Sequence, residues 1–286
     1  MRILITGANG MLGRELVPVL APLHEVRPVG HADCDIADEP SVRHIVAEWK
    51  PELVINCAAL SDVDGCELDP ERALAVNAHG AGYLARAAER AGARVFQIST
   101  DYVFDGERHT PYSEQDLPNP LSQYGRSKLE GERLVLGEGP QPSPHLVMRT
   151  SWLYGRYRTN FVDKAAENAL AGRPIRAVAE QVSCPTWTRH LAEKIAALVE
   201  ARASGILHLA GSGACSRYEM ACYIVSKLGC SAEVLGTAWA KISPPARRPV
   251  YTAMISTRLA EFGLTPLPDW KEALASYLAL RFAPAP

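Results

Sequence analysis

The sequence predicts an α/β fold in which a doubly wound parallel sheet is followed by a smaller C-terminal domain. Two observations support this prediction. The first half of the chain alternates short apolar runs with segments of helical periodicity, the order of elements in a parallel sheet with crossover helices. The apolar runs are hydrophobic at consecutive positions, as expected of strands that are buried on both faces of such a sheet.

Five apolar runs supply the expected strands, at residues 2–6, 26–29, 53–57, 95–100 and 146–150. Helices fill the gaps, because consecutive parallel strands need long connections that cross a face of the sheet. One helix is expected to begin near Met11 and another near Tyr124. These elements assign residues 1–150 to the first domain, a Rossmann fold.

Past residue 150 the pattern changes, because prolines and glycines interrupt it repeatedly. Residues 151–286 are therefore expected to form mainly the second, smaller domain. Residues 205–210 still have the pattern of a strand, and we expect strands within residues 174–210 to complete the first sheet. Helices are expected at residues 216–228 and 269–282.

The composition indicates a globular protein with no nucleic-acid or membrane partner. Of the 286 residues, 47% are hydrophobic and 22% are charged, and the formal net charge is −2 with basic residues scattered along the chain. The N-terminus enters the first strand directly, without the regions of a signal peptide, so we expect a cytoplasmic protein. Seven cysteines without a C-x-x-C pair, and histidines without an H-E-x-x-H motif, predict buried thiols and no metal site.

A glycine-rich turn follows the first expected strand and opens the first helix. Gly7, Gly10 and Gly13 have the spacing G-x-x-G-x-x-G. Such a turn needs glycine torsions and a close approach of the backbone to a pyrophosphate, and the helix N-terminus offers that anion free N–H groups. The motif therefore predicts that the first domain binds NAD(P).

The choice between the two nicotinamide cofactors depends on the end of the second strand. NAD sites usually place an acidic residue there to bind the ribose hydroxyls. Here the segment is Val-Gly-His-Ala-Asp at residues 29–33, with no acid directly at the strand end. We therefore expect NADPH as the cofactor, with NADH also accepted, and we expect Asp35 and Ile36 to flank the adenine.

Tyr124 and Lys128 stand four residues apart in a helical segment, so their side chains project from one face. An ammonium group beside a phenol stabilises the phenolate and so lowers the pKa of the tyrosine. Tyr124 is then able to exchange a proton with a carbonyl oxygen, and Lys128 can also bind the nicotinamide ribose. Thr100 ends a strand at the edge where parallel sheets bind ligands, and its hydroxyl is suited to a substrate carbonyl.

Together these motifs resemble the extended short-chain dehydrogenase/reductase family, and within it the dTDP-4-dehydrorhamnose reductases. The resemblance covers nearly the whole chain. The matching segments are residues 5–13, 54–59, 99–104, 124–128, 149–154 and 160–161, followed by Gln181, Pro185, Thr186, Arg248, Pro249, Asp269 and Trp270.

The resemblance implies that the chain reduces the 4-keto group of dTDP-4-dehydro-6-deoxy-L-mannose, also called dTDP-4-dehydrorhamnose, to give dTDP-L-rhamnose. Tyr124 would protonate the sugar oxygen, Thr100 would help to hold it, and Lys128 would tune Tyr124. The C-terminal domain would bind the nucleotide sugar. The implied cofactor contacts are Gly7, Asn9, Gly10, Met11, Leu12, Gly13, Asp35, Ile36, Ala58, Ala59, Tyr124 and Lys128.

The same resemblance implies a set of substrate contacts. Asp101, Tyr102 and Trp152 would lie near the sugar, and Ser61 and Val63 would line the pocket between cofactor and substrate. An indole beyond a strand end also offers a sugar an apolar face and an N–H donor. Asn160 and Arg248 suit the substrate diphosphate, because amide and guanidinium groups donate to phosphate oxygens, with Arg156 and Arg158 as alternatives.

The sequence departs from the family pattern in its C-terminal part. Residues 250–254 are Val-Tyr-Thr-Ala-Met where the family usually has an Asn-Ser or similar pair and a leucine, and residues 255–258 lack the common aspartate and lysine. Some members bridge a homodimer through magnesium and glutamates, and Glu15 matches one of these positions. A homodimer is therefore possible, and no required metal is predicted.

The sequence bears on three other functions. A related 4,6-dehydratase would need a second acid after Asp101, but Tyr102 stands there, so a reductase is favoured. Reduction of another nucleotide-linked 4-keto-deoxysugar stays open, since the departures lie in the substrate half. A non-catalytic NADP-binding subunit, similar to the regulatory subunit of methionine adenosyltransferase, also stays open, although the intact catalytic residues argue against it.

Overall fold

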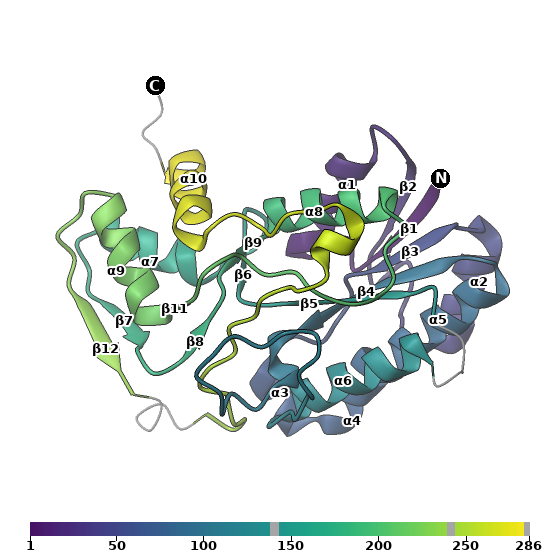
Figure 1. Ribbon diagram of the computed structural model, residues 1–286, viewed down its shortest axis with the longest axis horizontal. Helices are drawn as coiled ribbons and strands as arrows, with labels where there is room; N and C mark the ends of the chain where they lie inside the picture. Colours follow the sequence, from purple (N-terminus) through teal and green to yellow (C-terminus); the bar gives the residue numbers. More distant parts are fainter. Residues whose placement is uncertain (138–142, 239–243, 283–286) are drawn as a thin grey trace.

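The computed structural model describes residues 1–137, 143–238 and 244–282. Its centre is a parallel sheet of six strands in the order β2-β1-β3-β4-β5-β10 (Figure 1). The strands are β1 (Arg2–Thr6), β2 (Glu25–Val29), β3 (Leu53–Asn56), β4 (Arg94–Thr100), β5 (Leu146–Thr150) and β10 (Gly205–His208). The chain proceeds from β1 to β2 in one direction and from β3 onward in the other, so the loops after β1 and β3 diverge and leave a crevice, the usual ligand position in such sheets.

Helices cover both faces of the sheet (Figure 1). Helices α1 (Met11–Leu20) and α8 (Thr188–Glu200) lie on one face, and α2 (Glu39–Trp49), α5 (Gly80–Arg90) and α6 (Gln123–Leu136) on the other. In β1, Ile3 and Ile5 pack in the core with α1 and α8, whereas Leu4 packs in the core with α2 and α5. This alternation explains the continuous hydrophobic runs of the sequence and confirms the predicted doubly wound sheet.

The predicted elements agree with the structure apart from their ends. The strand expected at residues 205–210 is β10, which pairs with β5, so the chain returns to the first sheet after leaving it. Helix α1 begins at Met11, as expected. The two C-terminal helices are α9 (Arg217–Lys227) and α10 (Trp270–Phe282). Ser216 caps α9 in a reciprocal arrangement with Glu219, which is why that helix starts where it does.

Short helical segments connect β3 to α5 and extend β4. These are α3 (Val63–Leu68), α4 (Pro70–Leu74), a π-helical turn at Ala75–His79 that leads into α5, and a 3-10 turn at Asp101–Val103 directly after β4. They lie below the sheet beside α6 in the view of Figure 1. This cluster places residues 57–68 and 101–103 close to the C-terminal ends of β3 and β4.

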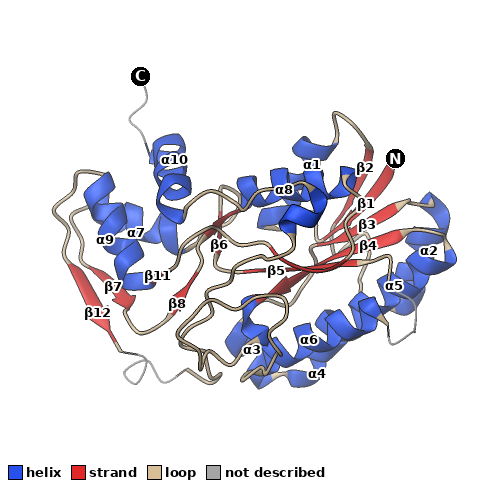
Figure 2. Cartoon of the chain, viewed as in Figure 1, coloured by secondary structure: helices blue, strands red, loops and turns tan. Residues whose placement is uncertain are grey.

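A second group of elements lies beyond the sheet, at the left of Figure 2. Helix α7 (Phe161–Leu170) shares a hydrophobic core with α9 and α10, and a parallel pair, β7 (Ile175–Val178) and β12 (Val234–Thr237), packs beside them. Four further strands of two residues each, in two pairs, join this group to the sheet: β6 (Leu153–Tyr154) with β9 (Thr186–Trp187), and β8 (Val182–Ser183) with β11 (Cys215–Ser216). A 3-10 turn at Leu259–Phe262 packs back on the first core.

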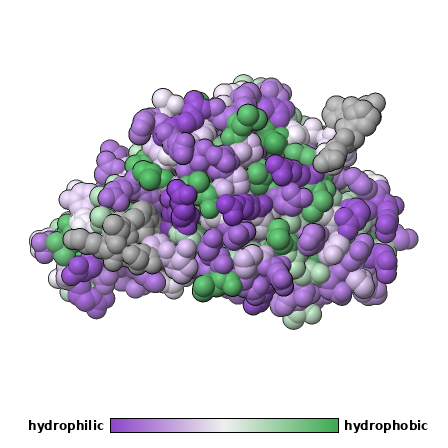
Figure 3. Space-filling view, turned by 90° about the horizontal axis from the view of Figure 1, so that it is seen from below, coloured by the Kyte–Doolittle hydropathy of each residue, from purple (hydrophilic) through white to green (hydrophobic). Residues whose placement is uncertain are grey.

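Residues after 150 therefore contribute to both parts of the molecule, since α8 packs on one face of the first sheet and β10 is one of its strands. The division at residue 150 stays a prediction about where substrate binding begins. The seven cysteines are free thiols, four of them buried and three partly exposed. In the part of the chain that the structure describes, no helix is long and apolar enough to cross a membrane. Figure 3 shows the hydrophobic side chains of one face as small, separate groups among hydrophilic ones.

Candidate active site

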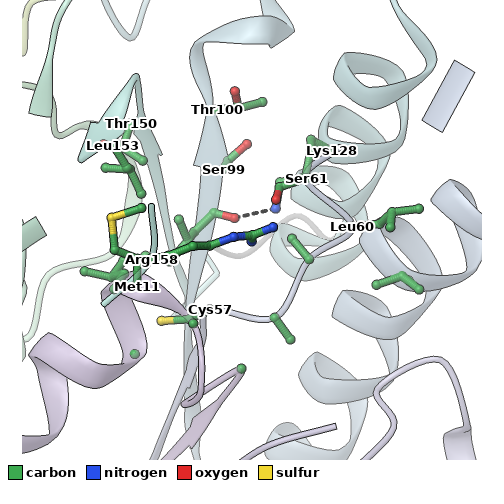
Figure 4. A pocket seen from close by; sticks show the side chains of 18 of the residues that line it. Met11, Cys57, Leu60, Ser61, Ser99, Thr100, Lys128, Thr150, Leu153 and Arg158 are labelled. Atoms are coloured by element: carbon green, nitrogen blue, oxygen red, sulfur yellow. Dashed lines mark hydrogen bonds between the residues drawn. The ribbon is translucent and has the colours of Figure 1, made fainter. Parts of the chain in front are cut away.

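A cavity of about 800 Å³ opens at the C-terminal ends of the central strands. Its walls come from Gly7 after β1, Ala58 after β3, Thr100 at the end of β4 and Trp152 after β5. Figure 4 shows how Met11, Cys57, Thr100 and Lys128 surround the same space, although they come from different elements. The crevice that the sheet order predicts is therefore a cavity in the folded protein.

Most residues singled out in the sequence line this cavity. They are Gly7, Asn9, Gly10, Met11, Leu12, Gly13, Asp35, Ile36, Ala58, Ala59, Ser61, Thr100, Asp101, Tyr124, Lys128, Trp152 and Asn160. Val63, Tyr102 and Arg248 are not among the residues that line it. The structure thus brings the expected cofactor and catalytic residues to one place, and three of the expected substrate contacts lie outside the lining of that cavity.

The glycine turn fits a dinucleotide closely. Gly7 has φ +65°, and a Cβ there would lie 2.5 Å from the backbone nitrogen of Ala58. A Cβ on Gly13 would lie 2.6 Å from the Cα of Ala8. Gly10 precedes α1 without a side-chain cap, and the first turn holds no acidic residue, so its N–H groups and the helix dipole are available to a pyrophosphate.

In the loop after β2, the first acidic residue is hydrogen-bonded within the turn. Asp33 accepts a hydrogen bond from the backbone N–H of Gly30 at 2.8 Å, and it does not line the cavity. Asp35 does line the cavity, where its carboxylate lies 3.7 Å from His31 and accepts from the N–H of Ala37. The nearest acid after β2 therefore stabilises the turn itself.

Tyr124 and Lys128 lie one helical turn apart in α6 and both face the cavity. Lys128 is 4% exposed, and its Nζ donates a hydrogen bond to the carbonyl oxygen of Ile98 at 2.6 Å. Burial lowers the pKa of Lys128 to about 8, while the charge of Glu132, one turn further along α6, acts in the opposite direction. The ammonium form of Lys128 therefore predominates at neutral pH.

The environment of Tyr124 differs from the expectation drawn from spacing alone. Burial raises the pKa of Tyr124 above its ordinary value, and the nearby Asp101 and Tyr102 add to this, whereas a hydrogen bond with Thr100 lowers it. Tyr102 packs edge-on against Tyr124, with ring centres 5.7 Å apart. Burial penalises the phenolate most strongly, and it sets the direction of the shift opposite to the lowering that was expected from Lys128. Tyr124 is thus a phenol at neutral pH, ready to donate a proton.

Asp101 follows Thr100 and is 2% exposed. Its carboxylate accepts hydrogen bonds from the hydroxyls of Thr100, at 3.1 Å, Ser183, at 2.9 Å, and Thr252. Burial raises the pKa of Asp101 to about 6, although these hydroxyls oppose the shift. Asp101 therefore connects the end of β4 to two segments from later in the chain and orients the Thr100 hydroxyl.

The other residues expected to contact the substrate have neighbours that their positions in the sequence do not predict. Trp152 lines the cavity with φ +40°, a strained value for a bulky residue. Asn160 caps α7, and its Nδ2 already donates to Gly155, Arg158 and Asp163. Arg248 donates to both carboxylate oxygens of Asp64, at 2.7 and 2.8 Å.

Sequence reasoning missed two arginines that line the cavity, Arg72 and Arg217. Arg217 is the first residue of α9 and lines the cavity beside Trp152. Its neighbours Ser216 and Glu219 form a capping pattern, so the local sequence indicates a helix start and nothing more. Arg158, considered in the sequence only as an alternative, also lines the cavity, and Figure 4 shows its side chain extending across it.

Known proteins share both the sequence and this architecture. The family described as the RmlD substrate binding domain matches residues 1–281. The dTDP-4-dehydrorhamnose reductase of Mycolicibacterium smegmatis is 42% identical over 283 residues, which cover 97% of this chain and 85% of that protein. A Streptomyces antibioticus protein named probable dTDP-4,6-dihydroxy-2-methyloxan-3-one 4-ketoreductase is 41% identical over 96% of this chain and 93% of its own length.

Solved structures agree with these sequence relatives. The crystal structure of dTDP-4-dehydrorhamnose reductase from Bacillus anthracis in complex with NADP has a TM-score of 0.92 at 34% identity, and the match covers 98% of this chain and 99% of that one. The resemblance found in the sequence is thereby confirmed. This chain belongs to the RmlD substrate binding domain family.

Proposed function

We propose that this protein is an NAD(P)H-dependent reductase that converts dTDP-4-dehydrorhamnose to dTDP-L-rhamnose. The observation that carries the proposal is the convergence of Thr100, Tyr124 and Lys128 on a cavity whose other end is the glycine turn. The named activity of the Mycolicibacterium smegmatis relative supports this substrate. NADPH is the expected cofactor, with NADH also accepted, and the NADP complex of the Bacillus anthracis relative supports that choice.

The residues of the glycine turn would hold the cofactor's pyrophosphate. Asp35 and Ile36 would contact the adenine, and Ala58 and Ala59 would also contact the cofactor. When bound, NADPH supplies the hydride. Lys128, fixed by its hydrogen bond to Ile98, would orient the nicotinamide ribose. Thr100, at the end of β4, would donate a hydrogen bond to the substrate's carbonyl oxygen.

The proton comes from Tyr124. Reduction of a ketone requires an acid that is protonated before the reaction, and the raised pKa of Tyr124 keeps the phenol protonated at neutral pH. As negative charge develops on the sugar oxygen, Tyr124 donates its proton there. The Lys128 ammonium, one helical turn away, then stabilises the phenolate that is left.

The sugar would lie against Trp152, Ser61 and the end of β4 at Asp101, all of which line the cavity. Tyr102 contributes indirectly, since its ring packs against Tyr124 and its hydroxyl accepts a hydrogen bond from Gln181 at 3.1 Å. Val63, Asn160 and Arg248 stay predictions as substrate contacts.

A possible homodimer also stays a prediction. Glu15, which matches a magnesium-bridging position of some family members, is 7% exposed, and its Oε1 has no hydrogen-bond partner among the described residues. Burial raises the pKa of Glu15, and the positive charges of Arg156 and Arg189 oppose this. Sedimentation velocity with and without MgCl₂ tests whether the chain associates.

A second candidate substrate is another nucleotide-linked 4-keto-deoxysugar. The Streptomyces antibioticus relative, almost as similar as the first, is named as a 4-ketoreductase of a different dTDP sugar. The two possibilities share the catalytic residues and differ only in the sugar that the cavity accepts. They are separated by comparing kcat/KM for the two sugars.

The decisive experiment follows NADPH and NADH oxidation at 340 nm with enzymatically generated dTDP-4-dehydrorhamnose. We expect Tyr124→Phe to lower kcat by about 10²- to 10⁴-fold, the usual contribution of a general acid. Tyr223→Phe is the matched control, because that hydroxyl donates to the Lys271 carbonyl away from the cavity. If folded, NADPH-binding protein oxidises no cofactor with this sugar or with other 4-keto sugars, the reductase proposal is wrong and a regulatory subunit becomes the better explanation.

A further inference from the structure

The cavity contains a cation that the proposed mechanism does not use. Arg217 begins α9, and it lines the cavity together with Trp152 and Phe161. The central carbon of its guanidinium lies 3.9 Å from the centre of the Trp152 ring and 4.9 Å from the centre of the Phe161 ring. Two aromatic side chains, one before α7 and one at its first turn, therefore hold this arginine in place.

The guanidinium of Arg217 lacks an anionic partner within the part of the chain that the structure describes, where it makes no hydrogen bond or ion pair. Asp101 and Tyr102 act on it only through space, and the Asp101 carboxylate is already occupied by three hydroxyls. Burial lowers the pKa of Arg217 to about 10, so it stays charged at neutral pH. Arg217 is only partly exposed, and a partly desolvated charge without a counter-ion favours the binding of an anionic ligand.

The packing of Arg217 determines which of its groups a ligand meets. The guanidinium carbon lies over the rings of Trp152 and Phe161, and the N–H donors of Arg217 have no acceptor among the described residues. Trp152 keeps its position at a strained φ of +40°, which fits a residue fixed by a functional requirement. The arrangement presents a planar fork of donors, the geometry that matches phosphate oxygens.

Other donors considered for an anion are less available. The amide nitrogen of Asn160 is spent on three acceptors around the start of α7. Arg248 is held by both oxygens of Asp64 and does not line the cavity. Arg158 lines the cavity but is exposed, so water screens its charge.

We propose that Arg217 binds the diphosphate of the nucleotide-sugar substrate and thereby fixes the distance between that group and the catalytic Tyr124. This inference rests on the proposed function for the kind of substrate, a nucleoside diphosphate sugar, and adds the residue that recognises its charge. Bidentate hydrogen bonds from a guanidinium stacked on Trp152 and Phe161 would replace the missing counter-ion. Arg217 is then a determinant of substrate affinity and takes no part in proton transfer.

The test measures ligand binding by calorimetry in the presence of NADP⁺, so it does not depend on turnover. The ligands are dTDP, UDP and thymidine, of which the last lacks the diphosphate. The variants are Arg217→Gln and Arg217→Met, the second of which keeps a long side chain between the two rings. Arg189→Gln is the matched control, because Arg189 also lies over a tryptophan, 5.9 Å from the Trp187 ring, but does not line the cavity.

In both Arg217 variants we expect the Kd of dTDP to rise about 10- to 100-fold, the usual loss for hydrogen bonds to a charged group, with thymidine and NADPH unchanged. Arg189→Gln should match the wild type. The proposal is overturned if dTDP binds the variants within about twofold of wild type, or if dTDP and thymidine weaken equally. Normal reduction of dTDP-4-dehydrorhamnose with unchanged KM in Arg217→Met would also overturn the proposal for Arg217, while the proposed function would stand. If dTDP binding depends on Arg217 but the protein does not reduce that sugar, the proposed function is wrong and the role of Arg217 stands.

Discussion

The Lys128 ammonium donates to the carbonyl oxygen of Ile98 at 2.6 Å, and this bond ties the helix that carries Tyr124 to the strand that ends in Thr100. Lys128 thus has a structural partner as well as the proposed role in stabilising the phenolate. A neutral amine keeps N–H donors, so the hydrogen bond does not need the charge of Lys128, whereas stabilisation of the phenolate does. The proposed role of Lys128 is therefore sensitive to pH, and its position depends on the packing beneath the site.

The pKa of Lys128, lowered to about 8, predicts the alkaline limit of activity. Below that pH the side chain is charged and supports proton donation by Tyr124. As the pH rises through about 8 the charge is lost, so kcat/KM for the keto sugar should fall tenfold per pH unit. Tyr124 cannot cause this limb, because its own pKa is raised above the ordinary value near 10. A profile from pH 6.5 to 10 at constant ionic strength checks this, and a flat profile up to pH 10 would contradict it.

Gly7→Ala should disrupt the cofactor site for two reasons, the strain of a positive φ at a non-glycine residue and a steric clash. A methyl group there would lie 2.5 Å from the Ala58 nitrogen, so the ends of β1 and β3 would have to separate. Gly92→Ala is the control, since Gly92 also has a positive φ, +71°, but no neighbour within 4 Å. We expect Gly92→Ala to cost about 1 kcal/mol of unfolding free energy and to bind NADPH normally.

For Gly7→Ala we expect a larger loss of stability and a Kd for NADPH raised at least about 100-fold, because the pyrophosphate cradle is displaced. Fluorescence titration with NADPH and urea unfolding of both variants measure the two effects. Equal behaviour of the two variants would show that torsion, and not the close approach to Ala58, is what Gly7 provides.

Glu132 and Arg149 form a buried ion pair beneath the site. Arg149 donates to it from Nε at 3.0 Å and from Nη2 at 2.7 Å, and the Ser99 hydroxyl also donates to it. Both partners are about 2% exposed. Glu132→Gln leaves the Arg149 charge buried without a counter-ion, so we expect it to lower the free energy of unfolding by about 3–5 kcal/mol.

Glu130→Gln is the comparison for this change, because Glu130 pairs with Arg133 at 3.3 Å on the exposed side of the same helix. Its loss should cost less than about 1 kcal/mol, as is usual for surface pairs. Urea unfolding monitored by circular dichroism measures both. Comparable losses in the two variants would mean that burial contributes little to the Glu132–Arg149 pair.

The candidate site was partly predictable because some of its features are local. The three glycines, the four-residue spacing of Tyr124 and Lys128, and the strand that precedes Thr100 are each encoded within a few residues. Their periodicity also fixes where strands end, and the ends of parallel strands must meet at one edge of the sheet. The cofactor half of the cavity follows from this reasoning.

The substrate half did not follow in the same way, because pairing and burial there depend on segments that are distant in the chain. Arg248 pairs with Asp64, 184 positions away, and Asp101 is enclosed by Ser183 and Thr252. The sequence by itself determined the doubly wound sheet, the cofactor turn and the proposed catalytic pair, since these rest on local torsions and periodicity. Only the tertiary structure decided that the pKa of Tyr124 is raised and that Arg217 lies beside Trp152, since desolvation and contacts between distant segments exist only after those segments have packed together.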